Sequence, residues 1–207
     1  MQNRKGSVLA ANKLNFNYRG REPVFENLNL SIAAGERITL VGPSGCGKST
    51  FAQIIAGYLR PTSGDVLIDG EPLPHKGFCP VQLIYQHPEK AVNPRWKLRK
   101  VLAETGEPPQ DLLDKMGVKP QWLDRYPTEL SGGELQRFCI LRALTPQTRF
   151  LIADEISTML DVITQAQVWS FILAEVERRN IGLLAVTHSL ELAEKISTHI
   201  IRFEEIC

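Results

Sequence analysis

Two stretches of the sequence combine residue types that bind and hydrolyse phosphate groups. The first, GPSGCGKST at residues 42–50, matches the pattern G-x-x-x-x-G-K-[ST] in full, and we call it the phosphate loop. Its glycines let backbone N–H groups converge on phosphates, Lys48 neutralises phosphate oxygens, and Ser49 or Thr50 offers a hydroxyl to magnesium, with Ser49 the expected ligand. A chance glycine turn is disfavoured, because an apolar strand pattern precedes the loop and a helical pattern follows it.

The second stretch, FLIADE, is an apolar strand pattern that ends in two carboxylates. Asp154 suits a hold on magnesium, directly or through water, and Glu155 suits a general base. Solvated carboxylates at a strand end are the commoner case, but a phosphate loop upstream favours the functional reading.

Two more polar residues follow strand patterns. His188 in AVTHS is placed to contact a γ-phosphate or to position Glu155 and water, and Gln86 in YQHP to sense metal and attacking water. Most single histidines and loop glutamines are structural, so both alternatives stay open for these two residues.

A further glycine-rich stretch, LSGGELQR at residues 130–137, opens a second helix. We call it the LSGGELQR segment. Ser131 is a good N-cap and Glu134, three residues later, completes a capping box, so a well-capped helix is the simplest explanation. Gly132 and Gly133 cost backbone entropy that a cap does not require, and they let an anion approach the positive helix start. The segment therefore predicts a second phosphate-binding surface.

Tyr18 follows a strand pattern in which Leu14 and Phe16 alternate with polar residues. An aromatic ring at this strand end could stack on adenine. It could equally be a core or edge aromatic, because Phe16 shares its face, and both interpretations stay open.

These residues need a sheet and helices to bring them together. The first third of the chain mixes antiparallel strand patterns and an Asp69-Gly70 turn with one strand–loop–helix unit, whose helix is expected over 48–58. Residues 92–144 show a helical pattern interrupted by prolines. In the last third, strand patterns alternate with helices at 162–179 and 190–195, which implies parallel strands and right-handed crossovers.

The expected fold is thus α/β, with a P-loop NTPase core, an antiparallel β-subdomain and an inserted α-helical subdomain at about 87–145. The 207 residues suit a single domain, 1–207. A net charge of +1 gives no nucleic-acid footprint. Four widely spaced cysteines without a CxxC pair disfavour zinc, iron–sulfur and disulfide frameworks and suit reduced cytosolic thiols. The sequence has no apolar signal-peptide region and no apolar run near the ~20 residues of a membrane helix.

The order of these motifs resembles that of an ABC-transporter ATPase subunit over almost the whole chain. The resemblance implies ATP and Mg²⁺ as cofactors and a head-to-tail dimer, in which the LSGGELQR segment of one subunit completes the ATP site on the phosphate loop of the other. It implies Gln86, Glu155 and His188 as catalytic residues and Ser49, Gln86 and Asp154 around the metal. The implied nucleotide contacts are Tyr18, Gly42, Pro43, Ser44, Gly45, Cys46, Gly47, Lys48, Ser49, Thr50, Ser131, Gly132, Gly133, Gln136 and Asp161.

Two longer stretches, YQHPEKAVNPRWKLRKVLAE and STMLDVITQAQV, are similar to the importers of peptides and nickel. This implies an ATPase at the cytoplasmic face of the cell membrane, held there by two permease subunits. The other implied partners are a paralogous second ATPase and, indirectly, an extracytoplasmic solute-binding protein. Residues 86–95 are expected to pass motion to the permeases.

The alternatives are an importer of another cargo, a soluble ABC ATPase and a P-loop kinase. Soluble ABC ATPases typically carry a coiled-coil insert, tandem cassettes or metal-binding cysteines, and a kinase would not need the LSGGELQR segment. Three residues depart from the family pattern: Ile156 replaces a usual proline, Ala153 a leucine or isoleucine, and Ser189 a common aspartate. None of the three is a catalytic group, so hydrolysis is still expected.

Overall fold

The computed structural model describes residues 6–207, and a parallel sheet lies at its centre. Every neighbouring pair in this sheet is parallel, as the alternation of strands and helices predicted, and its strand order is β6-β7-β8-β3-β9. The strands are β3 (Arg37–Val41), β6 (Val81–Ile84), β7 (Phe150–Asp154), β8 (Gly182–Val186) and β9 (His199–Arg202). Strands β7 and β8 are buried along their whole length, which explains their continuous apolar runs.

A second sheet is antiparallel and is built by the first third of the chain. Its order is β2-β1-β4-β5, with β1 (Val8–Asn17), β2 (Pro23–Ala33), β4 (Ser63–Ile68) and β5 (Glu71–Pro72). Asp69 and Gly70 connect β4 to β5 with φ of 55° and 85°, the positive values that a type I′ hairpin turn requires. This turn and the antiparallel pairing were both predicted.

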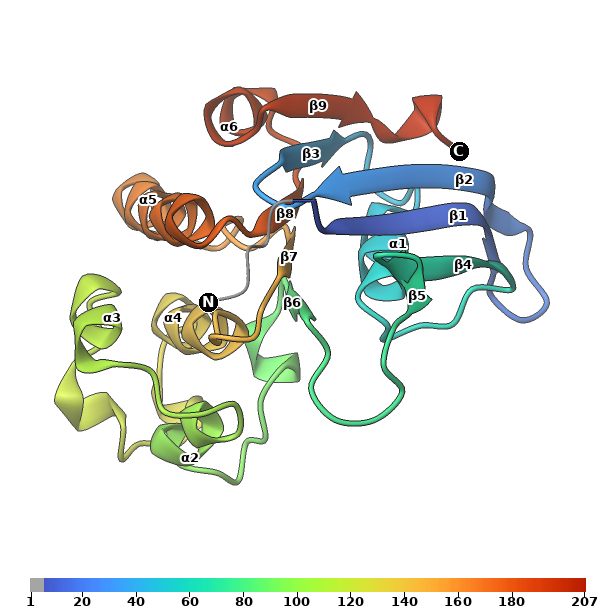
Figure 1. The fold of residues 1–207 in the computed structure, drawn as a ribbon. Coiled ribbons are helices and arrows are strands. Elements are labelled where there is room, and N and C mark those ends of the chain that lie inside the picture. Colours follow the sequence, from blue (N-terminus) through green and yellow to red (C-terminus); the bar gives the residue numbers. More distant parts are fainter. Residues whose placement is uncertain (1–5) are drawn as a thin grey trace.

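Helices cover the parallel sheet, and Figure 1 shows α1 beneath the antiparallel sheet while α2, α3 and α4 gather beyond the β6 edge. The predicted helix over 162–179 is confirmed, and that over 190–195 extends by one residue. The α-helices are α1 (Lys48–Ile55), α2 (Leu98–Ala103), α3 (Gln110–Lys115), α4 (Gly132–Ala143), α5 (Val162–Arg179) and α6 (Leu190–Ile196). The 3₁₀ turns are η1 (Pro88–Lys90), η2 (Pro120–Trp122), η3 (Pro127–Glu129) and η4 (Phe203–Glu205).

Helix α1 ends earlier than Tyr58, the end predicted from the sequence. Gly57 has φ of 80°, its N–H donates to Ile54 O, and the N–H of Tyr58 donates to Gln53 O. These two hydrogen bonds form a Schellman motif, which terminates the helix at a left-handed glycine. The glycine was visible in the sequence, and the apolar pattern was wrongly extended across it.

The segment between β6 and β7 is less helical than the pattern over 92–144 predicted. It contains α2, α3, α4 and three 3₁₀ turns, each of which begins with a proline, and residues 85–149 contain no strand. Proline has no N–H to donate and suits the first turn of a helix, so it divides the segment into short pieces. The strand pattern at residues 197–205 also predicted a longer strand than β9, which ends at Arg202. The strand stops there because Phe203 is buried in the core and begins η4.

Two hydrophobic clusters pack against opposite faces of the parallel sheet. In β7, Leu151 and Ala153 belong to the cluster with α4 and α5, whereas Phe150 and Ile152 belong to the cluster with α1 and the antiparallel sheet. This alternation fixes the register of β7. Because β6, β7, β8 and β3 run parallel to one another, their carboxyl ends lie along the same edge of the sheet. Polar residues that follow these four strands therefore meet at one edge.

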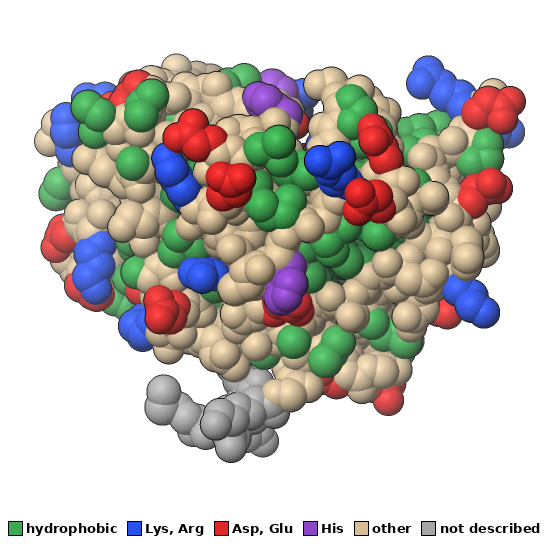
Figure 2. Space-filling model, turned by 90° about the horizontal axis from the view of Figure 1, so that it is seen from above, with side chains coloured by type: hydrophobic (Ala, Val, Ile, Leu, Met, Phe, Trp, Pro, Cys, Tyr) green, Lys and Arg blue, Asp and Glu red, His purple; other side chains and the backbone are tan. Residues whose placement is uncertain are grey.

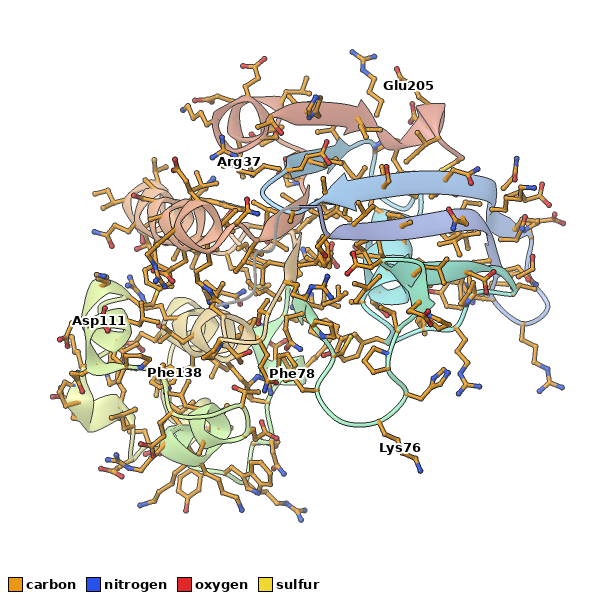
Figure 3. The ribbon with its side chains drawn as sticks, in the orientation of Figure 1. Arg37, Lys76, Phe78, Asp111, Phe138 and Glu205 are labelled. Atoms are coloured by element: carbon orange, nitrogen blue, oxygen red, sulfur yellow. The ribbon has the colours of Figure 1, made fainter. Side chains whose placement is uncertain are left out.

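The surface has mixed charge. On the face shown in Figure 2, acidic and basic side chains are interspersed. Lys76, at the tip of the loop between β5 and β6, points into solvent (Figure 3). Within residues 6–207, none of the helices has the length and apolar character needed to cross a membrane.

Candidate active site

The phosphate loop connects β3 to α1 and leaves the start of that helix open. Gly45 and Gly47 have φ of 84° and 107°, which glycine adopts without strain. Gly47 is the N-cap of α1 and gives no side-chain hydrogen bond to the helix. A Cβ on Gly47 would lie 2.6 Å from Val24 Cγ1, so only glycine fits there. The free N–H groups at this helix start can bind an anion.

Lys48 is held inside the phosphate loop by backbone carbonyls. Its side chain is 5% exposed, and Nζ donates to Gly42 O at 2.8 Å and to Pro43 O at 2.7 Å. Cys46 Sγ lies 3.6 Å from the same nitrogen. Phosphate oxygens that entered the loop would compete for this ammonium group with neutral carbonyls, and a hydrogen bond between two oppositely charged groups is the stronger of the two.

Ser49 lies in the first turn of α1, which follows β3, and its side chain meets that of Asp154 at the end of β7. Ser49 Oγ donates to Asp154 Oδ1 at 2.9 Å, and Asp154 is 4% exposed. Burial raises the pKa of Asp154, the charge of Glu155 adds to the rise, and the Ser49 hydrogen bond and Lys48 oppose it. A nearby cation would favour the ionised carboxylate.

The donor set fits Mg²⁺ in a particular way. The described residues contain no cluster of three or more His, Cys, Asp or Glu side chains that could hold a metal alone. Ser49 and Asp154 offer one hydroxyl and one carboxylate, both hard oxygen donors. Magnesium commonly binds through one or two protein oxygens and completes its shell with water and substrate phosphates. The residues therefore fit this ion if phosphates share the site.

Glu155 occupies a backbone conformation that is unusual for its type. Its φ is 48°, in the left-handed region, where a non-glycine residue is strained. Three hydrogen bonds hold its backbone there: its N–H donates to Val186 O at 3.0 Å, and its carbonyl accepts from Thr158 Oγ1 at 3.1 Å and from the Thr158 N–H at 3.3 Å. Ile156, which stands where the family usually has proline, is buried in the core. The conformation turns Glu155 out of the line of β7.

The Glu155 carboxylate lies between the two other predicted catalytic residues. Gln86 Nε2 donates to Oε2 at 3.1 Å, and His188 Nδ1 lies 3.8 Å from Oε1. Gln86 follows β6 and His188 follows β8, on either side of β7. The side chain of Glu155 is 17% exposed and that of His188 is 62% exposed. This arrangement gives a water molecule access to a carboxylate that an amide and an imidazole orient.

Gln86 and Glu155 line a cleft of about 490 Å³ together with the phosphate loop. Its walls include Ser44, Gly45, Gly47, Lys48, Ser49, Thr50, Gln86 and Glu155. Tyr18 also lines it, 42% exposed, with its hydroxyl 3.1 Å from Thr50 Oγ1 and its ring edge-on to Phe16 at 4.9 Å. Tyr18 lies just after β1, in a turn closed by the bond from Arg21 N–H to its carbonyl.

Sequence reasoning missed three residues of this cleft: Arg21, Glu22 and Val24. Arg21 and Glu22 belong to the turn between β1 and β2, Val24 lies at the start of β2, and none of the three carries a motif. The only available signal was an aromatic strand end followed by a Gly-containing turn, which marks a loop over the sheet edge without saying which loop residues face the cleft.

The LSGGELQR segment does not line this cleft in the described chain. Ser131 is the N-cap of α4: its Oγ accepts from the N–H of Glu134, and Glu134 Oε2 accepts from the N–H of Ser131 at 2.9 Å. The predicted capping box is confirmed. The Ser131 N–H hydrogen bond is the main reason that the pKa of Glu134 is lowered. A Cβ on Gly132 would meet open space, and one on Gly133 would lie 3.0 Å from Leu160 Cδ2.

Asp161 also serves as a helix cap. It precedes α5, and its Oδ1 accepts from the N–H groups of Ile163 and Thr164, both at 3.0 Å. The hydrogen bond from the Thr164 hydroxyl is the first cause of its lowered pKa. Like Ser131 and Gly132, Asp161 is exposed, and it does not line the cleft of its own chain.

Gln136 lies apart from the other residues expected to contact nucleotide. It is 2% exposed, and its Nε2 donates to the carbonyl of Tyr85 at 3.2 Å. In this conformation the side chain is not available to a ligand. The sequence pattern correctly assigned Gln136 to the LSGGELQR segment, but it did not predict on which face of α4 the residue lies.

Comparisons with known proteins agree with this geometry. Residues 25–158 match the family model described as ABC transporter. The nickel import ATP-binding protein NikE of Brucella suis biovar 1 is 36% identical, over 89% of this chain and 77% of that protein. A protein from Sinorhizobium fredii named as a probable peptide ABC transporter ATP-binding protein is 34% identical, over 83% and 54%.

Solved structures share the fold. The dimeric bacterial ABC transporter cassette MJ0796 has a TM-score of 0.80 and 25% identity, covering 94% of this chain and 93% of that one. CbiO1 from Clostridium perfringens, part of the ABC transporter complex cbiONQ, has a TM-score of 0.74 and 22% identity, covering 94% and 83%. The matched motifs, the fold and the relatives agree, and the chain belongs to the ABC transporter family as an ATP-binding subunit that hydrolyses ATP.

Proposed function

We propose that this chain powers an importer of nickel or peptides from the cytoplasmic face of the cell membrane. The names of the nickel and peptide relatives support the cargo class. The proposed assembly contains two membrane permeases, a second ATPase and, indirectly, an extracytoplasmic solute-binding protein. Docking on the permeases, near residues 86–95, would hold the chain at the membrane, since its described residues 6–207 include no helix that could span one.

The observation that carries the proposal is the separation of two phosphate-binding helix starts. The start of α1 lines the cleft together with Glu155, whereas the LSGGELQR segment lies outside it. A second chain, turned head to tail, would bring its own LSGGELQR segment to this cleft. Val162 and Ile163, next to Asp161, are 82% and 72% exposed, which suits an interface at that end of α5.

Each residue then has a proposed role toward ATP. Tyr18 stacks on adenine, the loop Gly42–Thr50 with Lys48 binds the phosphates, and Ser131, Gly132, Gly133 and Asp161 serve the partner's site. Ser49 and Asp154, with Gln86 nearby, would hold Mg²⁺, which neutralises phosphate charge when bound.

The hydrolytic step is proposed to use the carboxylate and its two neighbours. Glu155 accepts a proton from, or polarises, the attacking water, while Gln86 orients that carboxylate and His188 contacts the γ-phosphate. The strained backbone of Glu155 and its hydrogen bond to Gln86 keep the carboxylate in one position.

Substitution of the catalytic carboxylate tests the mechanism. Glu155→Gln is expected to lower turnover about 100-fold or more while ATP still binds, because it removes the base and leaves the phosphate loop intact. The measurement is phosphate release by the chain with its partner ATPase and permeases, beside equilibrium binding of a fluorescent ATP analogue. Hydrolysis at the wild-type rate would remove Glu155 from the mechanism.

The cargo is tested by purification and uptake. An affinity tag on this chain should recover two permeases and a second ATPase, and cells lacking the chain should lose uptake of radioactive nickel or of a labelled dipeptide. Recovery of this chain with soluble proteins and no permease would contradict the importer assignment and leave the ATPase assignment standing.

A further inference from the structure

Gln136 is a buried amide whose hydrogen bond crosses from one structural unit to another. It lies in α4, next to Leu135 and two residues before Phe138, both buried in the core (Figure 3). Its Nε2 donates to the carbonyl oxygen of Tyr85, just beyond β6. An unpartnered buried amide is costly, so this bond fixes the distance between α4 and the end of β6.

The carbonyl of Tyr85 belongs to the same peptide unit as the nitrogen of Gln86. Because a peptide unit is planar, a hydrogen bond that orients this carbonyl also orients the Cα of Gln86. Gln86 in turn donates its own amide to Glu155 Oε2 at 3.1 Å. The Tyr85 ring packs edge-on to Tyr58 at 5.4 Å, and burial raises the pKa of Tyr85 to about 12. This packing limits how Tyr85 can move when the bond is broken.

The N-terminal end of α4, which precedes Gln136, lies beside the loop that follows Glu155. Ser131 caps the helix there, and a Cβ on Gly133 would lie 3.0 Å from Cδ2 of Leu160 in that loop. Because an α-helix has about 3.6 residues per turn, Gln136 lies between one and two helical turns from Ser131 along α4. A shift of the helix start therefore reaches the Tyr85 carbonyl through a rigid element.

We infer that Gln136 is a positioning residue for ATP hydrolysis: its hydrogen bond to the Tyr85 carbonyl holds Gln86 against Glu155 and links the start of α4 to the catalytic carboxylate of the same chain. The inference rests on the proposed roles of Gln86 and Glu155. In the proposed head-to-tail pair, Ser131 faces the partner's nucleotide. Gln136 then makes hydrolysis in one site depend on occupation of the other.

Gln136→Met tests this, because methionine has a similar volume and shape and no N–H donor. Leu135→Met is the matched control, at a buried position of α4 that has no part in the bond to Tyr85. With the partner ATPase and permeases present, Gln136→Met is expected to lower kcat about threefold to tenfold and to change KM by less than about twofold, the loss expected for one neutral hydrogen bond. Gln136→Asn, which keeps the amide but is too short, is expected to behave the same way and serves if the methionine variant does not fold.

A second readout does not depend on activity. In the isolated chain, the side-chain NH₂ resonance of Gln86, assigned by its loss in Gln86→Met, is expected to shift in Gln136→Met and not in Leu135→Met. An unchanged Gln86 resonance, or a kcat no lower than that of Leu135→Met, would overturn the inference. If the wild-type chain and its partners hydrolysed no ATP, the proposed function would fail, while the Gln86 resonance would still decide whether Gln136 positions Gln86.

Discussion

Helices α1 and α4 both begin at glycine-rich turns, but their first N–H groups have different partners. At α1, Gly47 offers no side-chain cap, and the neighbouring Lys48 ammonium donates to two backbone carbonyls and to Cys46 Sγ, none of which carries a negative charge. At α4, Ser131 and Glu134 satisfy each other's N–H groups. The first helix start is thus open to a ligand, and the second carries its own anion.

This difference shows how one chain can carry two phosphate-binding surfaces that have different roles. The α1 start depends on phosphate to complete its hydrogen bonds, so it belongs to a cleft that binds tightly. The α4 start is stable alone, and a phosphate must compete there with the Glu134 carboxylate. Four predictions test this contrast: a change at α1 should affect ATP binding, changes at α4 should affect dimer closure, and stability should respond to pH with opposite sign at the two helix starts.

Lys48→Ala should give the largest effect. It removes the cation from the open helix start, and ATP affinity is expected to fall about 100-fold, because charge-assisted bonds to several phosphate oxygens are lost. Titration of the isolated chain with a fluorescent ATP analogue measures this. Ser131→Ala is the control and should leave the affinity unchanged. Equal losses in both variants would mean that the two helix starts are not distinct.

Gly133→Asp should come next, with the opposite pattern. Its carboxylate adds negative charge at the α4 start, and its Cβ would meet Leu160, so ATP-driven dimerisation is expected to weaken about tenfold or more. The measurement is ultracentrifugation with ATP in a Glu155→Gln background. Lys76→Asp, in the exposed loop between β5 and β6, adds negative charge away from the α4 start and is the control. Loss of ATP binding by the Gly133→Asp chain alone would contradict the division of roles.

More of the structure around the start of α1 than around the start of α4 could be predicted from the sequence. The phosphate loop, the strand-end carboxylates and the capping box are local patterns, and their elements formed as expected. By contrast, the bond from Gln136 to Tyr85 joins residues 51 positions apart and depends on how α4 rotates against β6. Arg21 and Glu22 reach the cleft only because their turn folds over the phosphate loop. Contacts between distant elements follow from packing, which no local pattern encodes.

Glu134→Gln should give a smaller effect of opposite sign. Glutamine can still close the capping box, so unfolding free energy should change little, but the negative charge at the α4 start is gone. A phosphate then competes with a neutral group, and ATP-driven dimerisation is expected to strengthen about threefold. The same ultracentrifugation assay applies. Weaker dimerisation in this variant would show that Glu134 assists the anion instead of competing with it.

The smallest expected effect is on the pH dependence of stability, where substitutions at the two helix starts should change Tm in opposite directions. The pKa of Glu134 is lowered, so its carboxylate stabilises the fold above the pKa of unfolded glutamate, and this contribution is lost as pH falls through the folded pKa. Glu134→Ala should therefore lower Tm by about 1–2 °C at neutral pH and by less in acid. The pKa of Asp154, beside α1, is raised, so its buried charge destabilises the nucleotide-free chain at neutral pH, and Asp154→Asn should raise Tm there and lose this gain in acid. Calorimetry of both variants against the wild type at pH values above and below the carboxylate range measures this. Two shifts of the same sign would contradict the assignment of an open, ligand-dependent start to α1 and a self-satisfied start to α4.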